Sequence, residues 1–174
     1  MKKIIISIIT VFIVFLFQTN LFHHLAFNGI VPDLLLIVVC CYGYMRGETS
    51  GIISGFFCGL MLDVLYSNNL GFHSIVYLYL GFFNGLLNQL YIEEDIKVPI
   101  SCVCVSDLIS CLMTYCLKFL LNGNFNFQFY FLHIILPEVI YTTALTVAIY
   151  PLLKLIENKL IPFTFKKEED NNAV

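Results

Sequence analysis

The chain has 174 residues, of which 59% are hydrophobic and 12% are charged. This composition leaves too little polar surface to coat a water-soluble particle of that size, and it therefore excludes a soluble globular enzyme. The net charge of −3 is small, and the sequence lacks a basic stripe with interleaved aromatic residues, which argues against a nucleic-acid partner. We therefore expect a protein whose solvent is the lipid bilayer.

The first apolar segment, residues 4–21, follows Lys2 and Lys3 as in a signal peptide. Because no small-x-small cleavage motif follows it, we interpret it as a retained signal anchor. Polar and turn-forming residues delimit five further apolar segments. These are 32–45, 50–66, 71–91, 98–119 and 129–153. Most approach the roughly 20 residues that a helix needs to cross about 30 Å of hydrocarbon. Segment 32–45 is short, and it either enters at the interface at Pro32 or is re-entrant.

The distribution of lysine and arginine favours six crossings over five. With six crossings, every one of these residues except Lys118 lies on one side of the membrane. If segment 32–45 does not cross, the division becomes more even. We therefore expect an all-α integral membrane protein, a six-transmembrane-helix bundle with both termini in the cytoplasm. Residues 1–160 form a single polytopic membrane domain, and 161–174 form a short charged cytoplasmic tail with too few apolar groups to fold.

Glycines recur at every fourth position in two parts of the chain. They are Gly43, Gly47, Gly51, Gly55 and Gly59 in the first series and Gly81 and Gly85 in the second. This spacing predicts that each series lies along one helix face, where small residues let two backbones approach closely. Two alternatives remain open, namely packing within this protein and docking of a partner's helix.

Four acidic residues lie within or at the ends of apolar segments: Asp33, Asp63, Asp107 and Glu138. At about 1.5 Å per residue, the last three come to similar depths of about 15 to 20 Å from the cytoplasmic edge, whereas Asp33 lies nearer the external surface. Such carboxyl groups should face the bundle interior and be protonated or bound by hydroxyl and amide donors. The nearby donors are Ser106, Ser110, Thr114, Tyr141 and Thr142.

These acids allow three interpretations: a proton or cation relay, a ligand pocket, or a polar latch that fixes helix packing or holds a partner helix. The latch is favoured, because the acids have no lysine or arginine partner at their depth. For Glu138 a specific role follows from Pro137, which frees backbone carbonyls that a protonated carboxyl group can bind.

The remaining polar and aromatic features have structural interpretations. The seven cysteines lie in apolar runs and are expected to act as small apolar residues rather than as disulfide or zinc ligands. His23, His24, His73 and His133 fall at external helix ends and are interpreted as interfacial anchors, as are Phe125, Phe127, Phe129 and Phe131 on an extended stretch. No motif of an enzyme occurs, so we expect no catalytic residue, cofactor or metal.

Several short motifs together resemble the family of the rod shape-determining protein MreD. They are Pro32-Asp33-Leu34-Leu35-Leu36, Arg46-Gly47, Gly51-x-x-x-Gly55-Phe56-x-x-Gly59-Leu60-x-Leu62-Asp63, Leu70-Gly71, Tyr77-x-x-x-Gly81, Leu136-Pro137 and Tyr150-Pro151-Leu152-Leu153. The resemblance covers about residue 30 to 155. Glu138 does not fit the family pattern.

The resemblance implies a non-enzymatic subunit of the elongation machinery in the bacterial cytoplasmic membrane. It implies a fold similar to the six-helix substrate-binding subunits of energy-coupling-factor transporters. The implied partner is the single-pass protein MreC and, through it, the RodA glycosyltransferase with its transpeptidase and MreB filaments. A scaffold that docks such a partner would serve rod shape and lateral cell-wall synthesis.

The candidate residues for fold or partner docking come from two sources. The resemblance carries over Pro32, Asp33, Gly55, Gly59, Asp63, Gly71 and Gly81, and the chemistry of buried acids adds Asp107 and Glu138. The alternative function is a vitamin-binding transporter subunit, in which Asp63, Asp107 and Glu138 line a ligand cavity. Such subunits usually have an alanine-rich first helix, whereas residues 1–20 contain no alanine.

Overall fold

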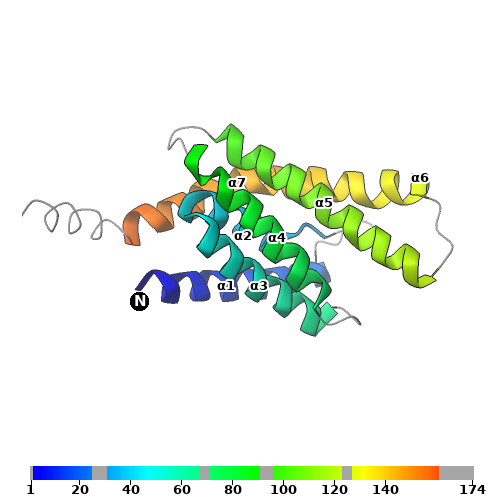
Figure 1. Cartoon of the computed structure of the whole chain (residues 1–174), viewed down its shortest axis with the longest axis horizontal. Coiled ribbons are helices and arrows are strands. Elements are labelled where there is room, and N and C mark those ends of the chain that lie inside the picture. The colour runs from blue at the N-terminus through cyan, green and yellow to red at the C-terminus, as the bar shows by residue number, and fades with distance from the viewer. Residues whose placement is uncertain (1, 25–30, 67–70, 91–95, 123–126, 161–174) are drawn as a thin grey trace, which may run out of the picture.

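The computed structural model describes residues 2–24, 31–66, 71–90, 96–122 and 127–160 (Figure 1). Its elements in chain order are α1 (Lys2–His24), α2 (Leu34–Arg46), α3 (Glu48–Tyr66), α4 (Phe72–Leu86), the 3₁₀ turn η1 (Leu87–Leu90), α5 (Lys97–Asn122), α6 (Phe127–Tyr130), the π-helical turn η2 (Phe131–Ile135) and α7 (Leu136–Leu160). Within these ranges there is no strand, which confirms the all-α prediction. The predicted tail, 161–174, lies outside the described residues.

The helices differ in whether they can cross a bilayer on their own. Three stretches are long and apolar enough, namely Glu48–Leu65, Lys97–Leu117 and Gln128–Glu157. Ser7–Asn20 and Leu34–Arg46 are shorter apolar helices. All of these agree closely with the segments predicted from the sequence, because each segment ends at a polar or turn-forming residue.

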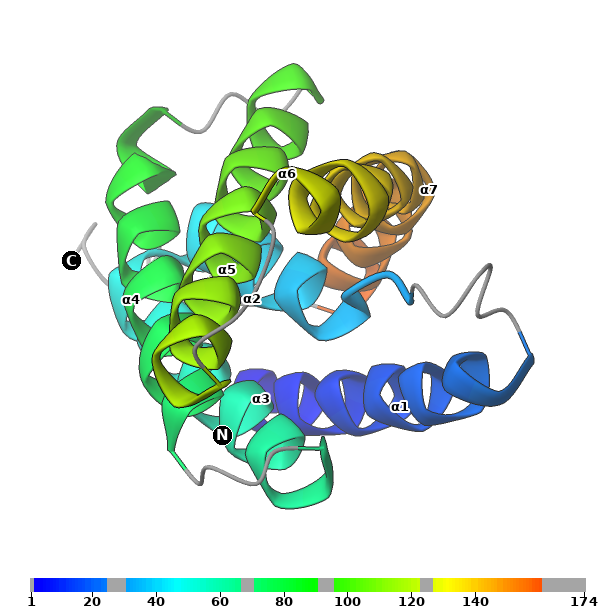
Figure 2. The same ribbon diagram turned by 90° about the vertical axis from the view of Figure 1, so that its right-hand side faces the viewer.

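Helix α2 lies at the centre of the bundle and contacts α1, α3, α4, α5 and α7 (Figure 2). Every residue from Leu34 to Tyr44 is buried. A helix that is apolar on all sides is stable only when neighbours cover all of it. Its 13 residues span about 20 Å at 1.5 Å per residue, less than the hydrocarbon thickness. Segment 32–45, for which the sequence left open an interfacial start or a re-entrant path, therefore forms one continuous helix inside the bundle.

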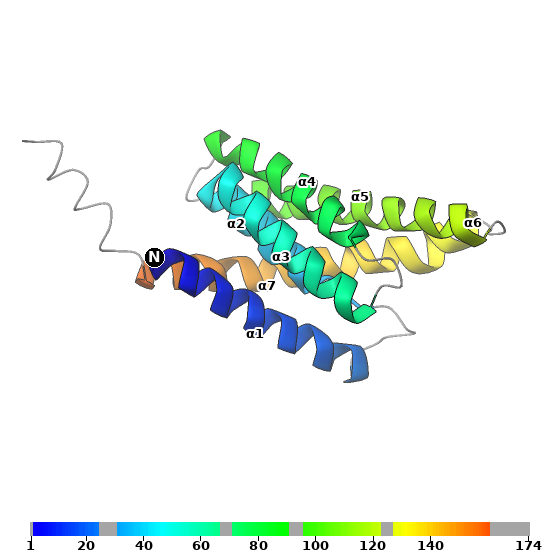
Figure 3. The same ribbon diagram turned by 60° about the horizontal axis from the view of Figure 1, so that its bottom comes forward.

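An arginine joins three helices at one end of the bundle. The Nε of Arg46, at the end of α2, donates to Oε1 of Glu157 in α7 at 2.6 Å, and its Nη1 donates to Oγ of Ser7 in α1. Its guanidinium also lies 4.3 Å from the centre of the Tyr42 ring. The start of α1 and the end of α7 consequently lie at the same end of the molecule, as Figure 3 shows.

We expect the substitution Glu157→Gln to destabilise the bundle moderately. The carboxylate and the guanidinium are both largely buried, at 16% and 11% side-chain exposure. Losing the charge on one partner of a hydrogen-bonded pair should cost about 1 to 2 kcal/mol of unfolding free energy. Unfolding by denaturing detergent measures this cost, and Lys97→Ala at an exposed position is the control. Equal stability of Glu157→Gln and Lys97→Ala would show that the pair contributes nothing.

The stretch that leads into α7 corrects one expectation. The alternation of phenylalanines predicted an extended stretch, but from Phe127 onward the chain is helical. In lipid a helix satisfies its own backbone hydrogen bonds, whereas an extended stretch does not. The turn Phe131–Ile135 is π-helical, and the Leu136 N–H donates to the carbonyl of Phe131. Pro137 follows immediately, and it has no N–H with which to continue the α-helical pattern.

Candidate functional site

Helices α3 and α4 are in backbone contact along a row of glycines, and they lie side by side in Figure 1. A Cβ atom added to Gly51 would overlap the carbonyl group of Gly81. One added to Gly55 would lie 2.7 Å from the Tyr77 carbonyl carbon, and one at Gly59 would lie 2.6 Å from that of His73. The face that carries Gly55 and Gly59 is thus covered by α4 of the same chain. This is the alternative in which the glycines serve packing within the protein.

The first glycine series does not lie along a single helix face, contrary to the sequence interpretation. The chain turns between α2 and α3 at Gly47, which has a φ of +89°. Gly43 therefore lies on α2, where an added Cβ would lie 2.8 Å from the Gly81 carbonyl oxygen and 3.1 Å from the Gly85 nitrogen. The turn brings α2 and α3 to the same glycines of α4, so that three helices pack backbone to backbone.

Asp63, near the end of α3, binds the start of α4. Its Oδ2 accepts hydrogen bonds from the N–H of Gly71 at 3.0 Å and from the N–H and hydroxyl of Ser74 at 2.9 and 2.8 Å. Its Oδ1 accepts from the N–H of His73 at 3.1 Å and contacts His73 Nδ1 at 2.9 Å. Gly71 has a φ of +100°, a backbone conformation that residues other than glycine rarely adopt. Asp63 thereby satisfies backbone donors that the first turn of a helix leaves free.

The environment of His73 differs from the sequence interpretation, which treated it as an interfacial anchor. Its side chain is 25% exposed and its ring pairs with Asp63. The sequence itself contains a signal for this contact. An acid at a helix end, followed after a turn by glycine and then by hydrogen-bond donors, is the pattern expected for capping the next helix.

Asp33 links the start of α2 to three other helices. Its carboxylate caps α2 by accepting from the Leu36 N–H at 3.2 Å, and it also accepts from Gln18 of α1 and from the Tyr77 hydroxyl of α4. Its own N–H donates to the Thr142 hydroxyl of α7 at 3.3 Å. Pro32, immediately before it, is buried. The Pro32-Asp33 pair is therefore a structural junction of α1, α2, α4 and α7.

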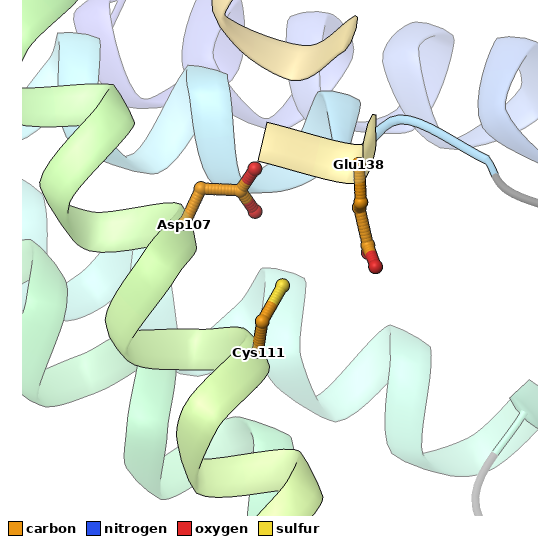
Figure 4. A group of neighbouring side chains, drawn as sticks. All are labelled: Asp107, Cys111 and Glu138. Carbon is orange, nitrogen blue, oxygen red and sulfur yellow. The ribbon is translucent and has the colours of Figure 1, made fainter. Parts of the chain in front are cut away.

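A third group of polar residues consists of Asp107 and Cys111 of α5 and Glu138 of α7 (Figure 4). Ligand atoms of the three side chains all lie within 4.8 Å of one another. Asp107 is 1% exposed and receives a hydrogen bond from Thr142, one of the donors expected from the sequence. Its Oδ2 is buried and has no hydrogen-bond partner among the described residues. The structure thus brings Asp107 and Glu138 together and leaves Asp63 in a separate set of contacts.

Sequence reasoning missed several of the residues that complete these contacts. Gln18 lies in a long apolar run, yet it binds Asp33 and the N–H of Leu35. Asn84 in α4 donates to the Ser106 hydroxyl of α5 at 2.8 Å. Cys111 was interpreted as an apolar residue, but its position four residues after Asp107 places it on the same helix face. The spacing alone indicates that Asp107 and Cys111 share a face. It does not indicate which neighbouring helix supplies Glu138.

The comparison with known families shows the family of the chain. The family model described as rod shape-determining protein MreD matches residues 1–160. No curated protein and no solved structure matches the chain. The matched range includes every helix that carries the glycine contact and the polar groups around Asp33, Asp63 and Asp107. The chain therefore belongs to the MreD family of rod shape-determining membrane proteins.

Proposed function

We propose that this protein is a multi-pass, non-enzymatic scaffold of the cell-elongation machinery in the bacterial cytoplasmic membrane. The observation that carries the proposal is the family match over residues 1–160. The mechanism is that of a rigid membrane bundle, which holds partner helices in place through packing and interhelical hydrogen bonds. The vitamin-binding alternative requires Asp63, Asp107 and Glu138 around one ligand cavity, whereas Asp63 binds the start of α4.

The proposed topology has six crossings with both termini in the cytoplasm. Three features support it. Successive helices α1 to α4 alternate in direction, and Arg46 joins the start of α1 to the end of α7. In the sequence, six crossings leave Lys118 alone among the lysine and arginine residues on the external side. The short helix α2 completes its passage inside a shell of longer neighbours. Reporter fusions at the two termini are expected to report the cytoplasmic side for both.

The proposed partner is a single-pass MreC-like protein, which connects the scaffold to a RodA-type glycosyltransferase with its transpeptidase and, indirectly, to MreB filaments. Because α4 fills the glycine face, we propose that the partner helix docks on an outward apolar face. Such faces carry large exposed side chains on every outer helix, for example Phe12 on α1, Phe57 on α3, Tyr79 on α4 and Ile140 on α7.

Depletion in a rod-shaped host, combined with photocrosslinking, tests this function. We expect depletion to widen and round the cells, and we expect a crosslinker at one of the outward positions to trap the single-pass partner. The same crosslinker at Ser54, which is buried, serves as the control and should give only contacts within the chain. Unchanged cell width on depletion, or no partner at any outward position, would contradict the proposal.

A further inference from the structure

The cluster of Asp107, Cys111 and Glu138 has the composition of a metal site rather than of a helix cap. Asp63 and Asp33 each accept hydrogen bonds from backbone N–H groups at the start of a helix. Among the described residues, no backbone N–H donates to Asp107. The two α5 residues are four positions apart and project on one face toward α7, and the three side chains converge in Figure 4. The cluster therefore brings side chains of two helices together.

The carboxylate of Asp107 is only partly satisfied by the protein. Thr142 accounts for one hydrogen bond, whereas the buried Oδ2 has no hydrogen-bond partner among the described residues, and Asp107 forms no ion pair with any of them. An unsatisfied polar atom in a membrane domain is costly, and so is a second carboxyl group beside it. A bound cation would satisfy the free oxygen and offset the repulsion between the two acids.

The donor set favours a divalent transition metal over other cations. Calcium and magnesium take oxygen ligands almost exclusively, whereas zinc accepts cysteine sulfur together with carboxylate oxygen. Ligand atoms at about 2.0 to 2.3 Å from one tetrahedral zinc ion lie about 3.3 to 3.8 Å apart. In the structure these atoms lie within 4.8 Å of one another, so the three side chains have to approach by about 1 Å to close on an ion.

We propose that Asp107, Cys111 and Glu138 bind a divalent transition-metal ion, zinc(II) in the first instance, which pins α5 to α7. On binding, the Cys111 thiol loses its proton to the buffer and coordinates as the thiolate. With three protein ligands, a fourth position stays open for water. The site is independent of which partner the scaffold docks, since it lies between two helices of the same chain.

Metal retention by the purified full chain tests the site. The protein in mild detergent is stripped with a chelator, loaded with zinc chloride, desalted and analysed by plasma mass spectrometry. We expect about one retained zinc per chain and a raised thermal midpoint. Cys111→Ser should lower the affinity for zinc at least about tenfold, and so should Asp107→Asn. Cobalt(II) in place of zinc should give a thiolate charge-transfer absorption that disappears in Cys111→Ser.

The matched control is Cys104→Ser, which removes a partly buried cysteine on α5 beside the same apolar cluster. It should retain the metal and the cobalt absorption, and its helical circular dichroism should match that of Cys111→Ser. If Asp107→Asn does not fold, the comparison of the two cysteine variants still decides the question. Failure of the wild-type chain to retain zinc, or equal retention by both cysteine variants, would overturn the proposal.

Discussion

Substitution of Gly51 by leucine is expected to prevent α3 from packing against α4 and to leave little folded protein. An added Cβ already overlaps the Gly81 carbonyl group and would lie 3.1 Å from the Cα of Gly43. Both neighbours are backbone, so no side chain can rotate away to relieve the overlap. Overpacking of a tight core commonly costs about 1 to 3 kcal/mol and sometimes more, and a leucine at a contact of three helices belongs to the costly cases.

The yield of monodisperse protein after detergent extraction and the midpoint of unfolding measure this effect. Gly51→Ala should show a smaller loss, because alanine's better helix propensity, worth about 1 kcal/mol, offsets part of the overlap. Thr49→Leu places the same large side chain at an exposed position of α3 and should fold normally. A well-folded Gly51→Leu variant would refute the close backbone contact.

The second large effect is expected for Asp63→Ala, which removes the acceptor at the start of α4. Gly71, His73 and Ser74 would lose their hydrogen-bond acceptor, with Ser74 fully inside the bundle. Loss of a helix cap costs about 0.5 to 2 kcal/mol, and each buried donor left unsatisfied adds about 1 to 3 kcal/mol. We therefore expect a loss of about 3 kcal/mol or more.

Unfolding in denaturing detergent measures this loss as well. Asp63→Asn keeps one acceptor oxygen and should fall between Asp63→Ala and the wild type. Glu48→Ala, which removes an exposed acid from the same helix, should change stability by less than about 0.5 kcal/mol. If Asp63→Ala proves as stable as Glu48→Ala, the capping role is wrong.

The helices themselves could be predicted from the sequence because each apolar run ends at a turn. Gly47 and Gly71 mark the starts of α3 and α4, and the predicted segments match the bounds of α2, α3 and α5 within about three residues. Helix α4 ends at Leu86, before the end of its predicted segment, and α7 continues to Leu160, beyond the end of its own. The burial of Asp63 and Asp107 could be predicted as well, since an acid in an apolar run has to face the bundle interior.

The partners of these residues could not be predicted. The four-residue spacing of the glycines shows that Gly51, Gly55 and Gly59 share a face, but it does not show that Gly81 meets them. Likewise, an estimate of depth gives position along the membrane normal and not rotation about a helix axis. Asp63 and Asp107 therefore received similar depths, although one caps α4 and the other faces α7.

The burial of α2 from Leu34 to Tyr44 has a consequence for biogenesis. Most of the surfaces that cover α2 lie on α3, α4, α5 and α7, and all four of these helices are synthesised after it. Being too short to span on its own, it gains a stable position only when those later helices arrive. Insertion of this chain should therefore end with a concerted assembly around α2, and truncation before α5 should expose the nascent protein to quality-control proteases.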